Sequence, residues 1–328
     1  MVLGHGSGGR LSAELLRDVF LPAFGAPAAL EDQATVAVPG TRIAMTTDSF
    51  VVRPLFFPGG DIGKLAVCGS VNDLAVGGAR PLYLAVAFIL EEGLPMDQLR
   101  RIAESMRRAC DEAEIRLVTG DTKVVDKGKG DGVFITTTAV GVVPESCTLS
   151  IASARPGDAI VVSGSLGDHG VAILSVREGI EFETPLLSDC APLTGLAQAA
   201  LAAGRVRCMR DPTRGGLSSA LNELAEASRV GVELDETRIP LKPEVRSACE
   251  MLGLDPLYVA CEGRLVAAVA PADEERVLAA LRAHPQGREA ASIGHVVAEH
   301  AGFVTVRSLV GGDRVLPMLS GEQLPRIC

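Results

Sequence analysis

Segments typical of β-strands alternate with amphipathic helical segments along this chain, and they do so in two successive runs. Such alternation is typical of helices layered on sheets, so each run predicts an α/β or α+β structure. The chain has 328 residues, more than one hydrophobic core usually serves, and two domains are therefore expected. The first run contains helix-type segments at residues 11–24, 59–81 and 96–113, and strand-type segments at 42–52, 82–90, 116–125 and 132–143.

A change of sequence texture near residue 150 separates the two runs. The stretch "RPGD" is a turn signal, and an apolar strand follows it. Residues 313–328 have weak periodicity and two prolines, and they are predicted to be a tail. The second run before that tail holds a glycine loop at 164–170 and helices at 191–204 and 217–229. The expected division of the chain is 1–149, 150–312 and 313–328.

The composition excludes several classes of protein. Trp is absent and aromatic residues make up 3%, so the core must be aliphatic and a stacking platform for single-stranded nucleic acid is not expected. The net charge of −10 offers no basic face to nucleic acid. No secretory signal is visible, and the longest apolar run, residues 82–90, is too short to span a bilayer. A soluble cytoplasmic protein is expected.

The eight cysteines contain no CxxC pair, so neither a zinc ribbon nor a disulfide scaffold is indicated. Seven of them are expected to be small buried hydrophobic residues. Cys328 differs because it ends the chain, in "LPRIC", and chain ends are seldom buried. A terminal thiol on an arm stiffened by Pro325 can reach into a site and be modified there, although an inert exposed cysteine is an alternative.

Four aspartates lie beside small or polar residues next to a hydrophobic segment: Asp48 in "TTDS", Asp73 in "VND", Asp121 in "TGDTK" and Asp211 in "RDPTRGG". Mg²⁺ takes carboxylate oxygens and usually bridges to phosphates, so these residues are candidate ligands. Each could instead cap a helix or stabilise a turn. Lys123 would share a strand face with Asp121 and could neutralise charge on a phosphate, or simply be exposed.

Three glycine-rich segments could offer backbone N–H groups to an anion; they are residues 4–9, 164–170 and 214–216. His5 and His169 lie in the first two and could donate to phosphate, or be solvated. The chain has no Walker A loop, because "GGDIGK", residues 59–64, has the wrong spacing and Leu65 stands where Ser or Thr belongs. Each segment alone could be a flexible connector.

Together these segments resemble the hydrogenase maturation factors of the HypE family, which are carbamoyl dehydratases in the aminoimidazole ribonucleotide synthetase-like superfamily. The resemblance runs in order from residue 4 to residue 328. It rests on "HGSGG", "TTDSFVV", "PLFFPGGDIGKLAVCGSVNDLAV", "FILEEGLPM", "VTGDTKVV", "VSGSLGDHG", "RDPTRGG" and "LPRIC". Glycine loops alone would also fit selenophosphate synthetase or thiamine-monophosphate kinase, and the "PRIC" terminus separates the HypE family from those relatives.

The resemblance implies a two-domain α/β fold in which the N-terminal sheets of two subunits pair into a shared barrel, giving a homodimer. It implies an ATP-binding and dimerisation role for residues 1–149 and a tail that carries the reactive cysteine. ATP and Mg²⁺ would occupy a cleft near the dimer interface. The implied metal ligands are Asp48, Asp73, Asp121 and Asp211. The implied nucleotide-binding residues are Asp48, Lys64, Asp73, Asp121, Gly167, Asp168, His169, Asp211, Arg214 and Gly215.

The resemblance also implies a reaction. A HypF-like carbamoyltransferase places a carbamoyl group on Cys328, and ATP is used to dehydrate that thiocarboxamide to a thiocyanate. The cyano group passes to iron held by a HypC–HypD-like complex, as a ligand of the [NiFe]-hydrogenase centre. Glu262 and Lys123 are similar to the family's proton-handling pair. Two alternatives stay open: another ATP-dependent enzyme of the superfamily acting on a diffusible molecule, and a non-catalytic maturation scaffold.

Overall fold

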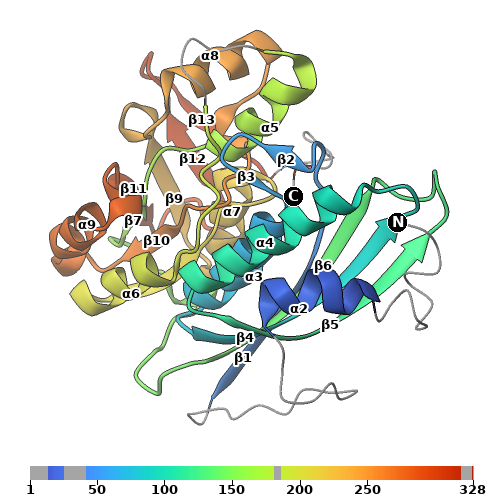
Figure 1. Cartoon of the computed structure of the whole chain (residues 1–328). Helices are drawn as coiled ribbons and strands as arrows, with labels where there is room; N and C mark the ends of the chain where they lie inside the picture. The colour runs from blue at the N-terminus through green and yellow to red at the C-terminus, as the bar shows by residue number, and fades with distance from the viewer. Residues whose placement is uncertain (1–13, 26–41, 181–185, 319–326, 328) are drawn as a thin grey trace.

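The computed structural model describes residues 14–25, 42–180, 186–318 and 327. In Figure 1 two halves lie side by side, each formed by a sheet with helices packed on it. This arrangement confirms the α/β (α+β) prediction and the two-domain layout. No helix within the described ranges combines the length and apolar character needed to cross a membrane.

The described residues of the N-terminal half form a four-stranded sheet in the order β1-β6-β4-β5. The β1–β6 and β6–β4 pairs are antiparallel, whereas β4 and β5 are parallel. The strands are β1 (Ile43–Phe50), β4 (Arg80–Glu91), β5 (Arg116–Val125) and β6 (Val133–Val142), and a separate hairpin joins β2 (Phe56–Phe57) to β3 (Gly60–Asp61). All the strand-type segments predicted in this half are therefore confirmed.

Helices α3 (Ile62–Val76) and α4 (Met96–Glu112) cover one face of this sheet (Figure 1). Helix α3 is apolar almost all round because it lies between the sheet and the second half. The segment predicted as a helix at 11–24 contains a π-helical turn, Leu16–Phe20, followed by α2 (Leu21–Phe24). It packs on the same core, with the Phe20 ring stacked 5.3 Å from that of Phe88.

The opposite face of the N-terminal sheet has no helix on it among the described elements. Side chains alternate along each strand, so the residues that point away from α3 and α4 share this face. Ile43, Met45 and Ile89 lie there with 58%, 71% and 42% of their surface exposed. Large exposed apolar side chains on one sheet face are typical of a surface that a partner covers.

The described residues of the C-terminal half form a seven-stranded mixed sheet in the order β13-β12-β9-β11-β7-β10-β8. Its strands are β7 (Ala159–Val162), β8 (Val206–Arg210), β9 (Gly231–Asp235), β10 (Val266–Val269), β11 (Ala291–Val297), β12 (Val304–Arg307) and β13 (Asp313–Val315). Its helices are α5 (Asp168–Glu178), α6 (Thr194–Ala203), α7 (Gly216–Ser228), α8 (Pro243–Leu252) and α9 (Glu274–Ala283). Aliphatic side chains of α7 cover one face, and those of α6 and α9 cover the other.

Short 3₁₀ turns connect these elements, at Ile151–Ser153, Glu236–Arg238, Pro256–Tyr258, Pro271–Asp273 and Pro285–Gly287.

One difference from the sequence prediction concerns the tail. Residues 313–315 form β13, which pairs with β12, and Leu316 behind it is fully buried. The sequence did not predict this strand, because three residues are too few to show alternation.

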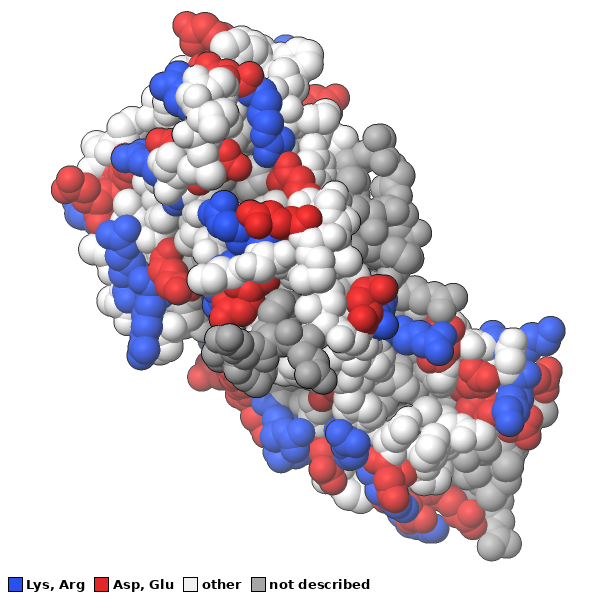
Figure 2. Space-filling model, turned by 90° about the horizontal axis from the view of Figure 1, so that it is seen from above, with Lys and Arg blue, Asp and Glu red and all other residues white. Residues whose placement is uncertain are grey.

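Acidic and basic side chains are interspersed over the face drawn in Figure 2.

Candidate active site

Three of the predicted aspartates gather where α3 ends against the edge of the N-terminal sheet. Thr46 donates a hydrogen bond from Oγ1 to Asp73 Oδ2 at 2.6 Å, and Ser70 donates from Oγ to Asp48 Oδ2 at 2.8 Å. Asp211 enters from the loop between β8 and α7. The two hydroxyl donors fix the carboxylates on β1 and α3 in place.

The electrostatics of this cluster are unfavourable without a cation. The pKa of Asp211 is raised to about 7, chiefly by burial and next by the neighbouring charge of Asp73. Burial is also the largest cause that raises the pKa of Asp73, and the charge of Asp48 adds to it. Neighbouring carboxylates that raise one another's pKa values are typical of a site that binds a cation. Within the described ranges, however, no three acidic, His or Cys residues already converge in a metal-binding arrangement.

Asp121 and Lys123 lie elsewhere in the subunit. Both are exposed on β5, where they pair with Ala87 and Ile89 of β4 and share the uncovered face of the sheet. The prediction that they share a face is confirmed. Strands β1 and β5 are opposite edges of the sheet, about 14 Å apart across three strand spacings. The four aspartates therefore cannot bind one ion within a single chain.

Glu262 is buried in the loop before β10, and its Oε1 atom has no hydrogen-bond partner among the described residues. Its backbone is held on both sides: its N–H donates to Asp189 Oδ1 at 3.1 Å, and its carbonyl accepts from Asn72 Nδ2 at 3.0 Å. Burial raises the pKa of the Glu262 carboxyl well above its usual range, and the charges of Cys190 and Asp211 raise it further. A buried carboxyl with a free oxygen is a candidate for moving a proton.

Asn72, which the sequence analysis did not select, joins the two halves at this point. Its side chain donates to the carbonyls of Ala191 and Glu262 and accepts from the N–H of Leu193 at 2.8 Å. The buried thiols of Cys68 and Cys190 lie against each other, because the hydrogen bond with Cys68 is the largest cause that raises the pKa of Cys190. The signal that could have identified Asn72 is its position in "VND", directly before Asp73.

Several amides of the glycine loop at 164–170 are already hydrogen-bonded within the protein. The N–H of Gly167 donates to Cys261 Sγ at 3.1 Å, and that of Gly170 donates to the Ala260 carbonyl. Asp168 is buried and accepts from Lys242 Nζ at 2.6 Å, with Arg264 at 3.4 Å. The Gly167 N–H and Asp168 Oδ2 thus already have protein partners, whereas Asp168 Oδ1 has none among the described residues. The assignment of Gly167 and Asp168 to nucleotide binding stays a prediction.

The tertiary structure places the His169 side chain against the end of the tail. It is fully buried, and its Nε2 lies 2.8 Å from the carbonyl oxygen of Ile327, the residue before the end of the chain. The ring therefore contacts the tail, and its assignment to nucleotide binding stays a prediction. Cys328 and His5 lie outside the described residues, so their assignments stay predictions.

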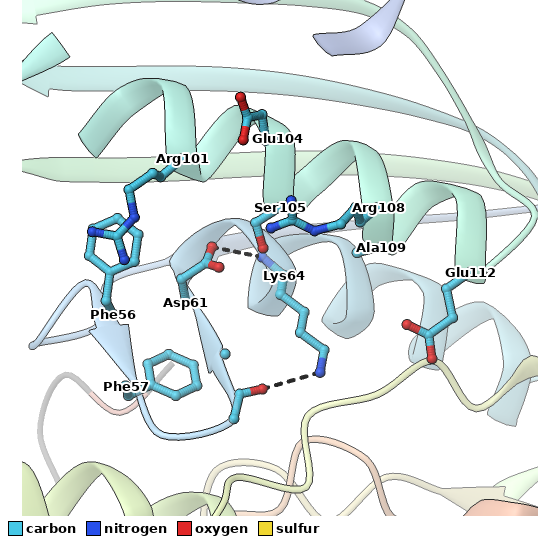
Figure 3. Close-up of a pocket in the computed structure, with 12 residues that line it drawn as sticks. Phe56, Phe57, Asp61, Lys64, Arg101, Glu104, Ser105, Arg108, Ala109 and Glu112 are labelled. Carbon is cyan, nitrogen blue, oxygen red and sulfur yellow. Dashed lines mark hydrogen bonds between the residues drawn. The ribbon is translucent and has the colours of Figure 1, made fainter. Parts of the chain in front are cut away.

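Lys64 lies at the start of α3, about 14 Å along the helix from Asp73. It lines a groove of ≈ 480 Å³ between the β2–β3 hairpin and α4, where its Nζ donates to the Gly59 carbonyl (Figure 3). Asp61 accepts from the N–H groups of Gly63 and Lys64 and so caps α3. Asp61 thus occupies two amides at this end of α3, and Lys64 does not join the aspartate cluster. Its assignment to nucleotide binding stays a prediction.

Arg214 and Gly215 precede α7 beside Asp211. Gly215 adopts φ +80° as the N-cap and leaves the first turn of α7 without a side-chain cap. Arg214 is exposed, and its charge opposes the rise in the pKa of Glu262. The loop therefore places a cation and a helix start without a side-chain cap in the same segment as Asp211, and the anion site predicted there stays a prediction.

Family models define the class of protein to which this fold and site correspond. The model described as "AIR synthase related protein, N-terminal domain" matches residues 30–143, and the model of the C-terminal domain of these proteins matches residues 155–307. The fold is therefore that of the AIR synthase related proteins.

Full-length relatives narrow the class. The carbamoyl dehydratase HypE of Rhizobium leguminosarum bv. viciae is 56% identical, over 99% of this chain and 94% of its own length. A crystal structure of the hydrogenase maturation protein HypE in complex with ATP is 48% identical with a TM-score of 0.96, and covers 100% of this chain and 99% of its own. HypE in a HypE–HypF complex is 44% identical with a TM-score of 0.82, over 95% and 100%. This chain belongs to the HypE family of carbamoyl dehydratases.

Proposed function

We propose that this chain dehydrates a carbamoyl group on its own terminal residue, Cys328, from thiocarboxamide to thiocyanate at the expense of ATP. The product would supply the cyanide ligand of the iron in [NiFe]-hydrogenase. The observation that carries the proposal is the buried Glu262 carboxyl with a free oxygen, in the half of the molecule that also receives the end of the tail. Family membership supports the reaction class.

ATP with Mg²⁺ fits the cluster formed by Asp48, Asp73 and Asp211, because a cation would relieve the repulsion that helps to raise the pKa values of Asp73 and Asp211. Mg²⁺ commonly combines few carboxylates with phosphate oxygens and water, which suits a site lacking a complete set of protein ligands. Arg214 and the uncapped α7 amides would face the phosphates. When bound, ATP supplies the phosphoryl group that makes the amide oxygen a leaving group. A structure of a HypE protein with ATP supports this choice of nucleotide.

The remaining chemistry belongs to residues of this chain. The carbamoyl oxygen leaves with phosphate, both N–H protons leave the nitrogen, and the carbon–nitrogen triple bond forms, so the adduct loses one water overall. Glu262 is assigned the role of base because its carboxyl is buried with a free oxygen, and burial raises its pKa and so its affinity for a proton. Burial keeps competing water away from the reacting group.

Glu262→Gln is expected to accept a carbamoyl group on Cys328 but to stall before the thiocyanate. Gln has nearly the same shape as a neutral Glu, so the fold should be unchanged, while the loss of a general base should slow dehydration by on the order of 10²–10⁴-fold. The intact mass of the protein after incubation with a carbamoyl donor system and ATP measures both steps. Glu250→Gln, on the exposed face of α8, is the control. Dehydration at the normal rate would remove Glu262 from the role and leave Lys123.

A homodimer accounts for the position of Asp121 and Lys123. If two N-terminal sheets pack through their uncovered faces, the β5 residues of one subunit can approach the aspartate cluster of the other. The apolar side chains on that face support this packing. The subunit would then be divided as the sequence predicts, with residues 1–149 for ATP binding and dimerisation, 150–312 as the second domain and 313–328 as the tail.

Charge on the uncovered face should therefore break the dimer. The double variant Met45→Asp, Ile89→Asp is expected to sediment as a monomer at micromolar concentration and to lose ATP turnover, since both side chains would bury a carboxylate. Met251→Asp, on an equally exposed residue of α8, is the matched control. A monomeric wild-type chain with full ATP turnover would contradict the shared site.

Partners follow from the reaction. A HypF-like carbamoyltransferase would load Cys328, and a HypC–HypD-like complex carrying iron would receive the cyano group. The HypE–HypF complex of a 44% identical protein supports the first partner. The tail must leave the protein interior for both exchanges, so its docking has to be reversible.

A further inference from the structure

We propose that His169 is a positioning residue that seats the end of the tail, through a hydrogen-bond relay from the loop 188–190 to the last peptide group of the chain. This inference rests on the proposed function of Cys328. Ile327 contributes the carbonyl that His169 contacts, and that carbonyl belongs to the peptide that joins Ile327 to Cys328. Fixing this peptide limits the space that the terminal thiol can explore.

The directions of the relay are determined by its two ends. The Ile327 carbonyl can only accept, so Nε2 of His169 carries the proton and donates at 2.8 Å. Nδ1 is then an acceptor, and Ser188 donates to it from Oγ at 2.8 Å. The N–H of Cys190 donates in turn to Ser188 Oγ at 3.1 Å. Every polar atom of the imidazole is thereby satisfied, in one tautomer.

The surroundings of the ring keep it neutral and in place. His169 is fully buried, and Phe57 meets it edge to face with the ring centroids 5.4 Å apart. Burial lowers the pKa of His169 to about 4, so the relay described above holds throughout the neutral range. Ile327 is itself buried, in the apolar cluster that contains Phe57 and Cys190. The tail end is thus held by packing as well as by the hydrogen bond.

A second set of contacts fixes the root of the tail. Ser218 and Tyr258 both donate to the Pro317 carbonyl at 2.8 Å, and Asn222 donates to the Leu316 carbonyl at 2.9 Å. With the root anchored on α7, only residues 318–326 lie between it and the contact with His169. An arm anchored at its root and seated at its tip presents its terminal group at high effective concentration.

The relay also connects the tail to the candidate base. Asp189, between Ser188 and Cys190, accepts the N–H of Glu262 at 3.1 Å. After burial, the interaction with Cys190 is the largest cause that raises the pKa of Glu262. The loop that seats the tail therefore also positions Glu262, so the docked tail and the base share one support.

The test compares the reactivity of the Cys328 thiol in the full-length protein. In His169→Phe, which keeps the ring contact with Phe57 but removes both nitrogens, alkylation of Cys328 by iodoacetamide should accelerate by roughly three- to tenfold, the equilibrium effect of one lost hydrogen bond. The mass of the C-terminal peptide reports this rate for Cys328 alone. Dehydration of the carbamoylated tail should slow by a similar factor, while carbamoylation by the donor system is unchanged or faster. His169→Gln, which retains a donor, should restore part of the wild-type behaviour.

A control variant, a second test variant and the choice of readout separate the docking of the tail from folding and from the proposed function. His295→Phe, on an exposed strand position, should change neither rate. Ser188→Ala breaks the relay without touching the ring and should shift both rates in the same direction, which keeps the test valid if His169→Phe does not fold. Alkylation measures docking even if the wild type never acquires a carbamoyl group. Folded His169→Phe and Ser188→Ala proteins with wild-type alkylation rates would overturn the inference.

Discussion

Cys328→Ala is expected to bind ATP normally and to acquire neither a carbamoyl nor a cyano adduct. The thiol is the proposed attachment point, and no chemistry can proceed on alanine at that position. The substitution lies at the chain terminus, so the free energy of unfolding should change by less than about 0.5 kcal/mol. Intact mass after incubation with a carbamoyl donor system and ATP is the measurement, and thermal unfolding checks the fold.

Three further variants sharpen this prediction. Removal of residues 324–328 should have the same effect, and an extension after Cys328 should also damage function, because the site is expected to fit a chain terminus. Cys147→Ala is the control, since Cys147 is a partly exposed cysteine outside the tail. An adduct on another cysteine of Cys328→Ala, with hydrogenase maturation intact, would contradict the tail as substrate and favour an enzyme acting on a diffusible molecule.

Asp73→Asn is expected to abolish ATP turnover while leaving the fold intact. The amide is a poorer ligand for Mg²⁺ and removes one of the charges that the cluster would use to hold it. The same change relieves repulsion with Asp48 and Asp211, so the melting temperature should stay the same or rise. A loss of activity together with an unchanged or higher melting temperature distinguishes a functional carboxylate from a structural one.

The matched control for Asp73→Asn is Asp97→Asn, at an exposed position in the first turn of α4. Phosphate release in the presence of ATP and Mg²⁺ measures turnover, and calorimetric unfolding measures stability. Wild-type turnover in Asp73→Asn would remove Asp73 from the site. A large drop in melting temperature would instead identify its hydrogen bond from Thr46 as structural.

Strands and helices were predictable because their signal is local. The apolar run at 82–90 anticipated β4, and the amphipathic pattern at 96–113 anticipated α4 almost to the residue. The aspartates of "TTDS", "VND" and "RDPTRGG" were predictable as a group, since small and polar residues at element ends point to a site. The role of Glu262 was predicted only from the resemblance to the HypE family. The local sequence "CEGRL" does not indicate that its carboxyl is buried with an oxygen that has no hydrogen-bond partner.

By itself the sequence determined the order of the elements, the aliphatic core and the types of reactive residue, because each depends on neighbours a few positions away. Only the tertiary structure decided which of those residues meet. The strand order places Asp121 and Lys123 at the far edge of the sheet from Asp48, and residues 260 and 261 accept hydrogen bonds from the amides of Gly170 and Gly167. The contact between His169 and Ile327 joins residues 158 positions apart. Such pairings are selected by burial and hydrogen bonding across the whole molecule, which no local pattern encodes.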